Sequence, residues 1–284
     1  MTTVFASLRA AVAELIRDGD TVAMEGFTHL IPHAAAHELI RQGRRELSLI
    51  RMTPDIIYDQ LIGVGAARRL VFSWGGNPGV GSLHRLRDAV EHQWPQPIEI
   101  VEYSHAMMAA AYVAGASGLP FGVLRAGVGT SLPAHNHDIR TVACPFSGET
   151  LTAIAAHRPL VAVIHAQRAD ATGNVQLWGI TGVQKEAIYS AQRTLVTVEE
   201  IVSTLTPVHG DVILPSVTIT GVCHVPRGAY PSYTQDYDRR DNAFYQAWDG
   251  LSRDRGIFTA WIDRHVRGTR DHAEFLASVA EAQA

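Results

Sequence analysis

Short apolar runs alternate with segments of helical periodicity along most of the chain. The runs are rich in β-branched residues and are bounded by Gly, Pro or Asp, which predicts strands. The predicted strands cover residues 21–27, 47–52, 69–74, 98–104, 121–125, 141–144, 160–166 and 195–198. The spacing between them predicts helices over residues 8–17, 33–42, 55–68, 83–92, 106–116, 149–157 and 183–191.

This alternation is typical of an α/β fold. Strands that are apolar on both faces favour a mostly parallel sheet, because each parallel crossover needs a helix to return the chain. We therefore expect an open, mostly parallel sheet with helices on both faces.

The pattern changes after about residue 211. Two extended pieces, at 212–219 and 222–225, precede a loop over 226–240 and helices over 242–253, 257–266 and 270–280. Because no low-complexity linker intervenes, we expect one domain over residues 1–240, with residues 241–284 as a helical C-terminal extension of the same domain. For the aromatic side chains between residues 230 and 261 we predict packing on a neighbouring subunit, with packing on the rest of this chain as an equally favoured alternative.

Composition excludes several classes of partner. The chain has 284 residues, and its 24 basic against 28 acidic residues give a net charge of -4, without the basic surface that nucleic-acid binding requires. Charged residues, His or Gly interrupt every apolar run before it reaches the length of a membrane span. Cys144 and Cys223 form no cysteine motif, so we expect a reducing, cytoplasmic location and a buried free thiol at Cys144.

Open α/β sheets bind ligands at the carboxyl ends of their strands, which directs attention to two loops. The first predicted strand ends at Glu25-Gly26-Phe27-Thr28, and the third runs into Ser73-Trp74-Gly75-Gly76-Asn77. Backbone N–H groups of the glycine-rich second loop could hold an anion or an oxyanion. The alternative is a tight turn that needs positive φ. The loop lacks the G-x-G-x-x-G pattern, so a nicotinamide-dependent dehydrogenase is disfavoured.

Glu102 is a candidate site carboxylate. It ends an apolar strand and, by alternation, shares a face with Ile98 and Ile100, where an ionised carboxylate needs a partner. The alternative is an acid that interacts with the N-terminus of the next helix.

Three histidines, His29, His33 and His37, stand four residues apart, which suggests a zinc site. Pro32 interrupts the spacing, and no H-E-x-x-H pattern occurs. We therefore expect no metal.

Several segments recur in a characteristic order over nearly the whole chain. They are Asp18-Gly19-Asp20-Thr21-Val22 before Gly26-Phe27; Ser73 to Asn77; Glu102-Tyr103-Ser104-His105 with Met107; Gly118-Leu119-Pro120-Phe121 with Arg125, Gly129 and Thr130; and Ala162-Val163-Ile164-His165-Ala166 with Asp170, Gly173 and Asn174. In order and spacing they resemble the α subunit of family I coenzyme A transferases, in particular the glutaconate CoA-transferase branch.

The resemblance implies a heteromeric CoA transferase. Members of the family move CoA from an acyl-CoA to a carboxylic acid through a nucleophilic glutamate, which in two-chain members belongs to the β subunit. It implies a β-subunit partner in a heterodimer or heterotetramer, a CoA thioester as substrate, and no permanently bound cofactor. The implied α-side lining of the shared site is Gly26, Phe27, Thr28, Ser73, Gly75, Gly76, Asn77 and Glu102. Glu25 departs from the family, which has a glycine there.

Other activities share this resemblance. In the steroid-ring-cleaving branch, an α-subunit glutamate that matches Glu102 activates water, so a CoA-thioester hydrolase or lyase with Glu102 as general base is the alternative. Other relatives decarboxylate. A non-catalytic binding subunit is a third possibility.

Overall fold

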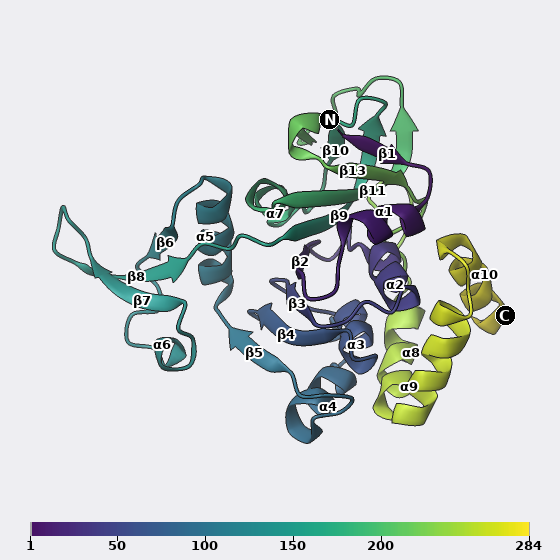
Figure 1. Cartoon of the computed structure of the whole chain (residues 1–284), viewed down its shortest axis with the longest axis horizontal. Coiled ribbons are helices and arrows are strands. Elements are labelled where there is room, and N and C mark those ends of the chain that lie inside the picture. Colours follow the sequence, from purple (N-terminus) through teal and green to yellow (C-terminus); the bar gives the residue numbers. More distant parts are fainter. Residues whose placement is uncertain (1, 284) are drawn as a thin grey trace.

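A ten-stranded sheet forms the centre of the molecule in the computed structural model, which describes residues 2–283 (Figure 1). Its main path runs β1 (Thr3–Phe5), β13 (Gly221–His224), β11 (Arg193–Val202), β9 (Val161–Asp170), β2 (Thr21–Met24), β3 (Leu47–Ile50), β4 (Ala67–Phe72) and β5 (Glu99–Glu102). All neighbours along this path are parallel. Two further strands, β10 (Val175–Leu177) and β12 (Val212–Leu214), extend β9 in antiparallel fashion. The predicted, mostly parallel sheet is confirmed.

The strand order reverses between β2 and β9. The chain proceeds from β2 through β3 and β4 to β5 on one side, and later from β9 through β11 to β13 on the other. In open α/β sheets, the carboxyl ends of the strands beside such a reversal are the usual place for a ligand.

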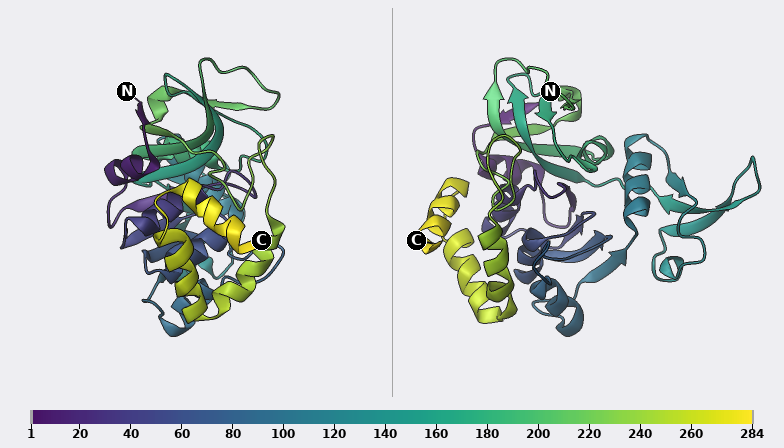
Figure 2. Two further views of the ribbon diagram at one scale, coloured as in Figure 1. Left: turned by 90° about the vertical axis from the view of Figure 1, so that its right-hand side faces the viewer. Right: turned by 180° about the vertical axis from the view of Figure 1, so that it is seen from behind.

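Helices cover both faces of the sheet, as expected. On one face lie α1 (Leu8–Leu15), α2 (His33–Arg41), α3 (Ile56–Gly63) and α4 (His84–His92); on the other lie α5 (His105–Ala116) and α7 (Gln184–Ser190) (Figures 1 and 2). The alternation of side chains along each strand supplies both cores. In β2, Val22 and Met24 join the first cluster and Ala23 the second.

Three C-terminal helices stack outside α2, α3 and α4 (Figure 2). They are α8 (Asn242–Arg253), α9 (Arg255–Ile262) and α10 (His272–Gln283), with a π-helical turn at Asp263–Arg267. The side chains of Tyr245, Trp248 and Phe258 are buried in the first core cluster, and Trp248 Nε1 donates to Asp59 Oδ2 at 3.1 Å. The prediction that these three side chains pack on a neighbouring subunit is therefore wrong, and the alternative, packing within the chain, is confirmed.

A second, three-stranded antiparallel sheet projects from the molecule (Figure 1). It contains β6 (Phe121–Leu124), β8 (Thr150–Ala155) and β7 (Ile139–Ala143) in the order β6-β8-β7, with the short helix α6 (Leu132–His135) between β6 and β7. We call residues 121–155 the arm. The predicted helix over 149–157 is wrong, because Thr152 and Ile154 alternate inward along a strand. The strands predicted at 121–125 and 141–144 exist, but they lie in the arm and not in the parallel sheet.

Most other predicted elements match the structure within a few residues. The extended piece predicted at 212–219 ends as a strand at Leu214 and continues as a 3₁₀ turn at Ser216–Thr218. The short strands β1 and β10 have no counterpart among the predicted elements. Within residues 2–283, no helix combines the length and apolar character that a bilayer crossing needs.

Candidate active site

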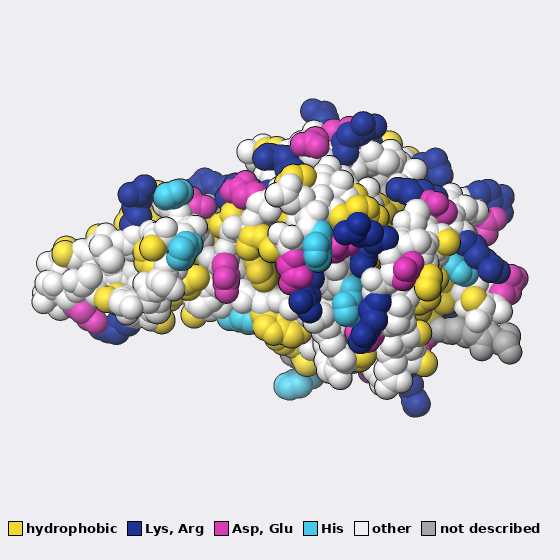
Figure 3. All heavy atoms as spheres, turned by 90° about the horizontal axis from the view of Figure 1, so that it is seen from below, with side chains coloured by type: hydrophobic (Ala, Val, Ile, Leu, Met, Phe, Trp, Pro, Cys, Tyr) yellow, Lys and Arg dark blue, Asp and Glu magenta, His cyan; other side chains and the backbone are white. Residues whose placement is uncertain are grey.

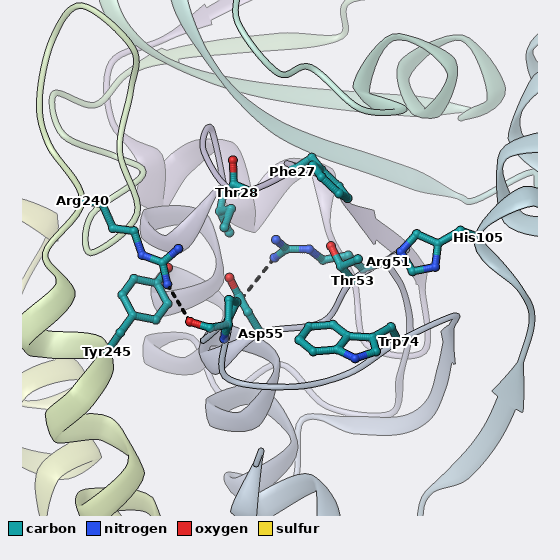
Figure 4. A pocket seen from close by; sticks show the side chains of 11 residues that line it. Phe27, Thr28, Arg51, Thr53, Asp55, Trp74, His105, Arg240 and Tyr245 are labelled. Atoms are coloured by element: carbon teal, nitrogen blue, oxygen red, sulfur yellow. Dashed lines mark hydrogen bonds and ion pairs between the residues drawn. The ribbon is translucent and has the colours of Figure 1, made fainter. Parts of the chain in front are cut away.

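A cavity of about 250 Å³ lies where β2, β3, β4 and β5 end (Figure 4). The loops after these strands and one C-terminal segment line it, with Phe27, Thr28, Ile31, Arg51, Thr53, Asp55, Trp74, Pro78, His105, Arg240 and Tyr245. Its place at the strand ends beside the reversal of strand order is the one that open α/β sheets use for ligands. Its size suits a short organic group, since pockets for whole small ligands hold about 300–1,000 Å³.

The loop after β2 forms one wall of the cavity. Gly26 is required by close approach, because a Cβ there would lie 2.6 Å from the carbonyl oxygen of Leu30. Thr28 has a positive φ of 64°, an uncommon conformation for a residue with a side chain, and it is exposed. The Thr28 carbonyl accepts from Ser232 Oγ at 2.9 Å, so the C-terminal segment holds this loop in place.

The loop after β3 places a buried ion pair beneath the cavity. Arg51 Nη1 lies 3.3 Å from Asp55 Oδ1, and Arg51 Nη2 donates to the Gly26 carbonyl at 3.0 Å. Asp55 Oδ1 also accepts from the Ile57 N–H and caps α3. Both charges are therefore bound to other groups of this chain.

Glu25 is buried beside this ion pair. Burial raises the pKa of Glu25 to about 7, although the Arg51 charge and hydrogen bonds from Tyr112 and Met52 oppose the rise. Tyr112 Oη donates to Glu25 Oε1 at 2.8 Å, and the Met52 N–H donates to the same oxygen at 3.1 Å. The carboxyl group that departs from the family pattern thus lies behind the cavity wall, within the core.

The C-terminal segment contributes a second arginine. The Arg240 guanidinium lies over the Tyr245 ring at 3.9 Å from its centroid, and Arg240 Nη2 donates to the Pro78 carbonyl at 3.2 Å. Tyr245 is itself buried, and its carbonyl accepts from Asn77 Nδ2 at 2.7 Å. Helix α8 and the glycine-rich loop therefore fix the position of Arg240.

Ser73 and His105 meet at the other end of the cavity. Ser73 Oγ donates to the Met52 carbonyl at 2.7 Å and lies 3.1 Å from His105 Nδ1. Because the hydroxyl has one proton, His105 Nδ1 must donate to Ser73, which leaves Nε2 as the acceptor of the neutral ring.

The residues named from the sequence lie at different distances from the cavity. Phe27 and Thr28 line it, Gly26 and Ser73 hold lining residues in place, and Gly75, Gly76 and Asn77 lie in the loop behind Trp74. The N–H groups of Gly76 and Asn77 already bind the carbonyls of Pro54 and Gly81. A Cβ at Gly76 would lie 2.7 Å from the Trp74 ring, so this glycine permits close packing of the loop.

The environment expected for Glu102 differs from the one observed. The side chain is exposed, and Ile98 and Ile100 on the same strand are only half-buried, because β5 is an edge strand. The expectation of an apolar surrounding is therefore wrong. Glu102 does not line the cavity, although it ends the strand that precedes His105.

The three histidines lie where the sequence predicts, whereas Cys144 is less buried than predicted. His29 lies in the loop, and His33 and His37 lie on α2, as the position of Pro32 predicts. All three rings are buried, and burial lowers the pKa of His29 to about 4 and the pKa of His33 and His37 well below the ordinary value. Cys144 is half-buried at the end of β7, so the prediction of a buried thiol is wrong there; Cys223 is buried.

Five polar residues of the cavity are not among the site residues named from the sequence: Arg51, Asp55, Thr53, Arg240 and Tyr245. The first two follow a correctly predicted strand at its carboxyl end, so that position was a usable signal. Arg240 had none, since 162 residues separate it from its partner Pro78.

Comparisons with known proteins agree with this arrangement. A family model described as coenzyme A transferase matches residues 5–224. One subunit of the 3-oxoadipate CoA-transferase of Pseudomonas knackmussii is 61% identical over 277 residues, which cover 98% of both chains. The corresponding subunit of the glutaconate CoA-transferase of Acidaminococcus fermentans is 28% identical over 95% of this chain and 90% of its own.

Solved structures show the same fold. The crystal structure of the glutaconate CoA-transferase from Acidaminococcus fermentans superimposes with a TM-score of 0.90 at 27% identity, over 99% of this chain and 94% of that chain. The crystal structure of a variant of the decarboxylase AibA/AibB gives a TM-score of 0.80 at 27% identity, over 93% of this chain and 100% of that chain.

Proposed function

The chain belongs to the coenzyme A transferase family, and on that premise we propose that it is the α subunit of a heteromeric CoA transferase. The enzyme moves CoA between an acyl-CoA and a carboxylic acid. Its acid substrate is a short dicarboxylic acid of the 3-oxoadipate kind. The high identity to the 3-oxoadipate CoA-transferase subunit over 98% of both chains supports this substrate class.

The interactions of Asp55 within this chain are the observation that supports a nucleophile on the partner subunit. Asp55 is the one carboxylate among the described residues that line the cavity, and it is buried, paired with Arg51 and bound to the Ile57 N–H. A carboxylate held in this way is a poor nucleophile, because attack would leave the buried Arg51 charge without a partner. The attacking glutamate therefore comes from the partner subunit.

The proposed reaction has two exchange steps. A carboxylate oxygen of the partner's glutamate attacks the thioester carbonyl carbon, the C–S bond breaks, and an acyl-glutamyl anhydride and the CoA thiolate result. The thiolate then attacks the glutamyl carbonyl carbon, which releases the acyl group as a free carboxylate and leaves a glutamyl-CoA thioester. The acid substrate takes up CoA by the reverse sequence, so no oxidant, reductant or water is consumed.

The residues of this chain position the acyl group in the proposal. Phe27 and Trp74 supply an apolar wall, Gly26 and Ser73 hold Arg51 and His105 in place, and the Gly75-Gly76-Asn77 loop supports Trp74.

We further propose that this subunit forms a heterodimer or heterotetramer in the cytoplasm, and that residues 241–284 belong to the same domain. The buried contacts of α8 with the glycine-rich loop support the last point.

Coexpression with the product of the adjacent reading frame tests the function. The complex should exchange CoA between succinyl-CoA and 3-oxoadipate, and each purified chain alone should be inactive. CoA exchange by this chain alone would contradict the proposal.

Replacement of Glu102 by Gln separates transfer from hydrolysis. A transferase whose nucleophile lies on the partner keeps its activity, because Glu102 is exposed and outside the cavity. A hydrolase that uses Glu102 as general base loses turnover while the complex stays assembled. Opening of the ring of a cyclic CoA thioester without acyl exchange, if the Glu102→Gln variant abolished it, would favour the hydrolase.

A further inference from the structure

A dicarboxylic substrate places a second charge in the cavity. When one carboxylate carries CoA, or attacks to take it up, the other stays ionised near neutral pH. An ionised carboxylate that leaves water needs a cation with hydrogen-bond donors. The inference of a residue that binds this second carboxylate rests on the proposed function.

Two guanidinium groups line the cavity, and only one is already in an ion pair. Arg51 is bound to Asp55 and to the Gly26 carbonyl. Within residues 2–283, no carboxylate lies within 4.0 Å of the Arg240 guanidinium, whose Nη2 binds only the neutral Pro78 carbonyl. Arg240 Nε is buried and has no hydrogen-bond partner among the described residues.

Asp55 is the acid that Arg240 influences from a greater distance. The positive charge of Arg240 opposes the rise that burial causes in the pKa of the Asp55 carboxyl, but Asp55 forms its ion pair with Arg51. Among the described residues that line the cavity, Arg240 is therefore the arginine whose hydrogen-bond donors bind no acid of residues 2–283.

The position of Arg240 is fixed before any ligand arrives. Its guanidinium stacks on the buried Tyr245 ring, and the Pro78 carbonyl holds one nitrogen. A guanidinium restrained in this way loses little side-chain entropy when a carboxylate binds it.

The cavity between its two ends matches a short carbon chain. Figure 4 shows Arg240 and Tyr245 on one side and His105 on the other, with Phe27 and Trp74 between them. The aromatic side chains can contact methylene groups, while Arg240 lies at the end farther from His105. A volume of about 250 Å³ admits an acyl group but not the nucleotide part of CoA.

We propose that Arg240 binds the free carboxylate of the acyl group and so makes the enzyme selective for dicarboxylic over monocarboxylic acids. Arg240 acts as a specificity-determining residue, and the Tyr245 ring and the Pro78 carbonyl orient it. Arg51 stabilises the cavity wall and takes no direct part in this selection.

The test compares R240Q, R240K and R239Q in the coexpressed two-subunit complex. Arg239 is the matched control, because it is the neighbouring arginine, exposed and absent from the cavity lining. Each complex is assayed with succinyl-CoA as donor, and with acetyl-CoA in a second series. The acceptors are 3-oxoadipate, adipate and hexanoate; hexanoate has the chain length of adipate with a methyl group in place of one carboxylate.

R240Q should raise KM for adipate and 3-oxoadipate, and lower kcat/KM for them about 10- to 100-fold, because a charge-assisted hydrogen bond is lost. With acetyl-CoA as donor, kcat/KM for hexanoate should stay unchanged or rise. R240K should retain part of the dicarboxylate activity, and R239Q should behave as wild type.

With acetyl-CoA as donor, equal losses of kcat/KM for adipate and hexanoate in R240Q, or a wild-type ratio of the two, would overturn the proposal. If R240Q does not assemble, the ratio of adipate to hexanoate activity in R240K decides, since a wild-type ratio there contradicts a directional guanidinium contact. A wild-type complex that transfers CoA to none of the acids instead contradicts the proposed function, so the two failures are distinguishable.

Discussion

Two ion pairs, one below the cavity and one in the arm, differ in burial far more than in length. Arg51 and Asp55 are 1% and 2% exposed at 3.3 Å, whereas Arg125 and Glu149 are 82% and 40% exposed at 3.0 Å. Charges separated by water interact weakly, so the shorter pair is the less important one. In this chain, burial rather than length therefore decides how much an ion pair contributes to stability.

The same contrast extends to apolar residues. Strand β2 buries Val22, Ala23 and Met24 between two helical layers, whereas in β6 the side chains of Phe121 and Val123 remain exposed. Hydrophobic side chains are visible on the surface of the arm, at the left of Figure 3. The parallel sheet therefore derives its stability from two packed faces, and the arm from one thin layer around Ile139, Thr152 and Ile154.

The largest effect is expected from Arg51→Met. It leaves Asp55 as a buried charge without its partner, which should lower the free energy of unfolding by about 3–5 kcal/mol. The measurement is urea unfolding followed by circular dichroism. The matched arm variant, Arg125→Met, should leave the midpoint unchanged. Equal shifts in the two variants would remove the distinction between the regions.

Burial also explains which elements can be predicted from the sequence. Strands β3 and β9 are recognisable because both of their faces are apolar, and their loops can be placed at the site because parallel strands end at one edge. For strand β8, Thr150–Ala155, the sequence predicts a helix instead. In β8, only Thr152 and Ile154 are buried, so the alternation of buried and exposed side chains is short. The neighbouring alanines favour a helix.

In the candidate site, too, only the residues that follow a strand with two apolar faces can be predicted from the sequence. Phe27 and Thr28 follow a strand with two apolar faces, so local pattern locates them. Arg240 reaches the cavity only because α8 packs against the glycine-rich loop. Such packing depends on the fold as a whole and leaves no periodic signal near residue 240.

A pH-dependent effect is expected next in size, from Glu25→Gln. The pKa of Glu25 rises from 4.5 to about 7 on folding, mainly through burial. The folded chain therefore binds this proton more tightly than the unfolded chain, and ionisation disfavours folding increasingly between pH 4.5 and about 7. Relative to wild type, the variant should gain up to about 3 kcal/mol across that range.

The measurement is urea unfolding of both proteins at pH 5, 6 and 7.5. The difference between them is the relevant quantity, because buried histidines such as His29 and His157, with pKa values of about 4, make both proteins less stable in acid. Tyr112→Phe sharpens the test. It removes a hydrogen bond that lowers the pKa of Glu25, so the pH range over which ionisation of Glu25 disfavours folding should extend to higher pH. A difference independent of pH would contradict burial of a titrating carboxyl.

The smallest effect is expected at the tip of the arm, from Phe146→Ser. The side chain is 97% exposed, and the turn that carries it is held by backbone hydrogen bonds between Cys144 and both Gly148 and Glu149. Removal of the ring takes away no packed contact, so the free energy of unfolding of the purified chain should change by less than about 0.5 kcal/mol. Phe258→Ala, which empties a buried position between α9 and Trp248, should cost about 3–5 kcal/mol in the same urea titration. A comparable loss from both phenylalanines would mean that the tip is packed in solution, and that exposure does not separate the arm from the parallel sheet.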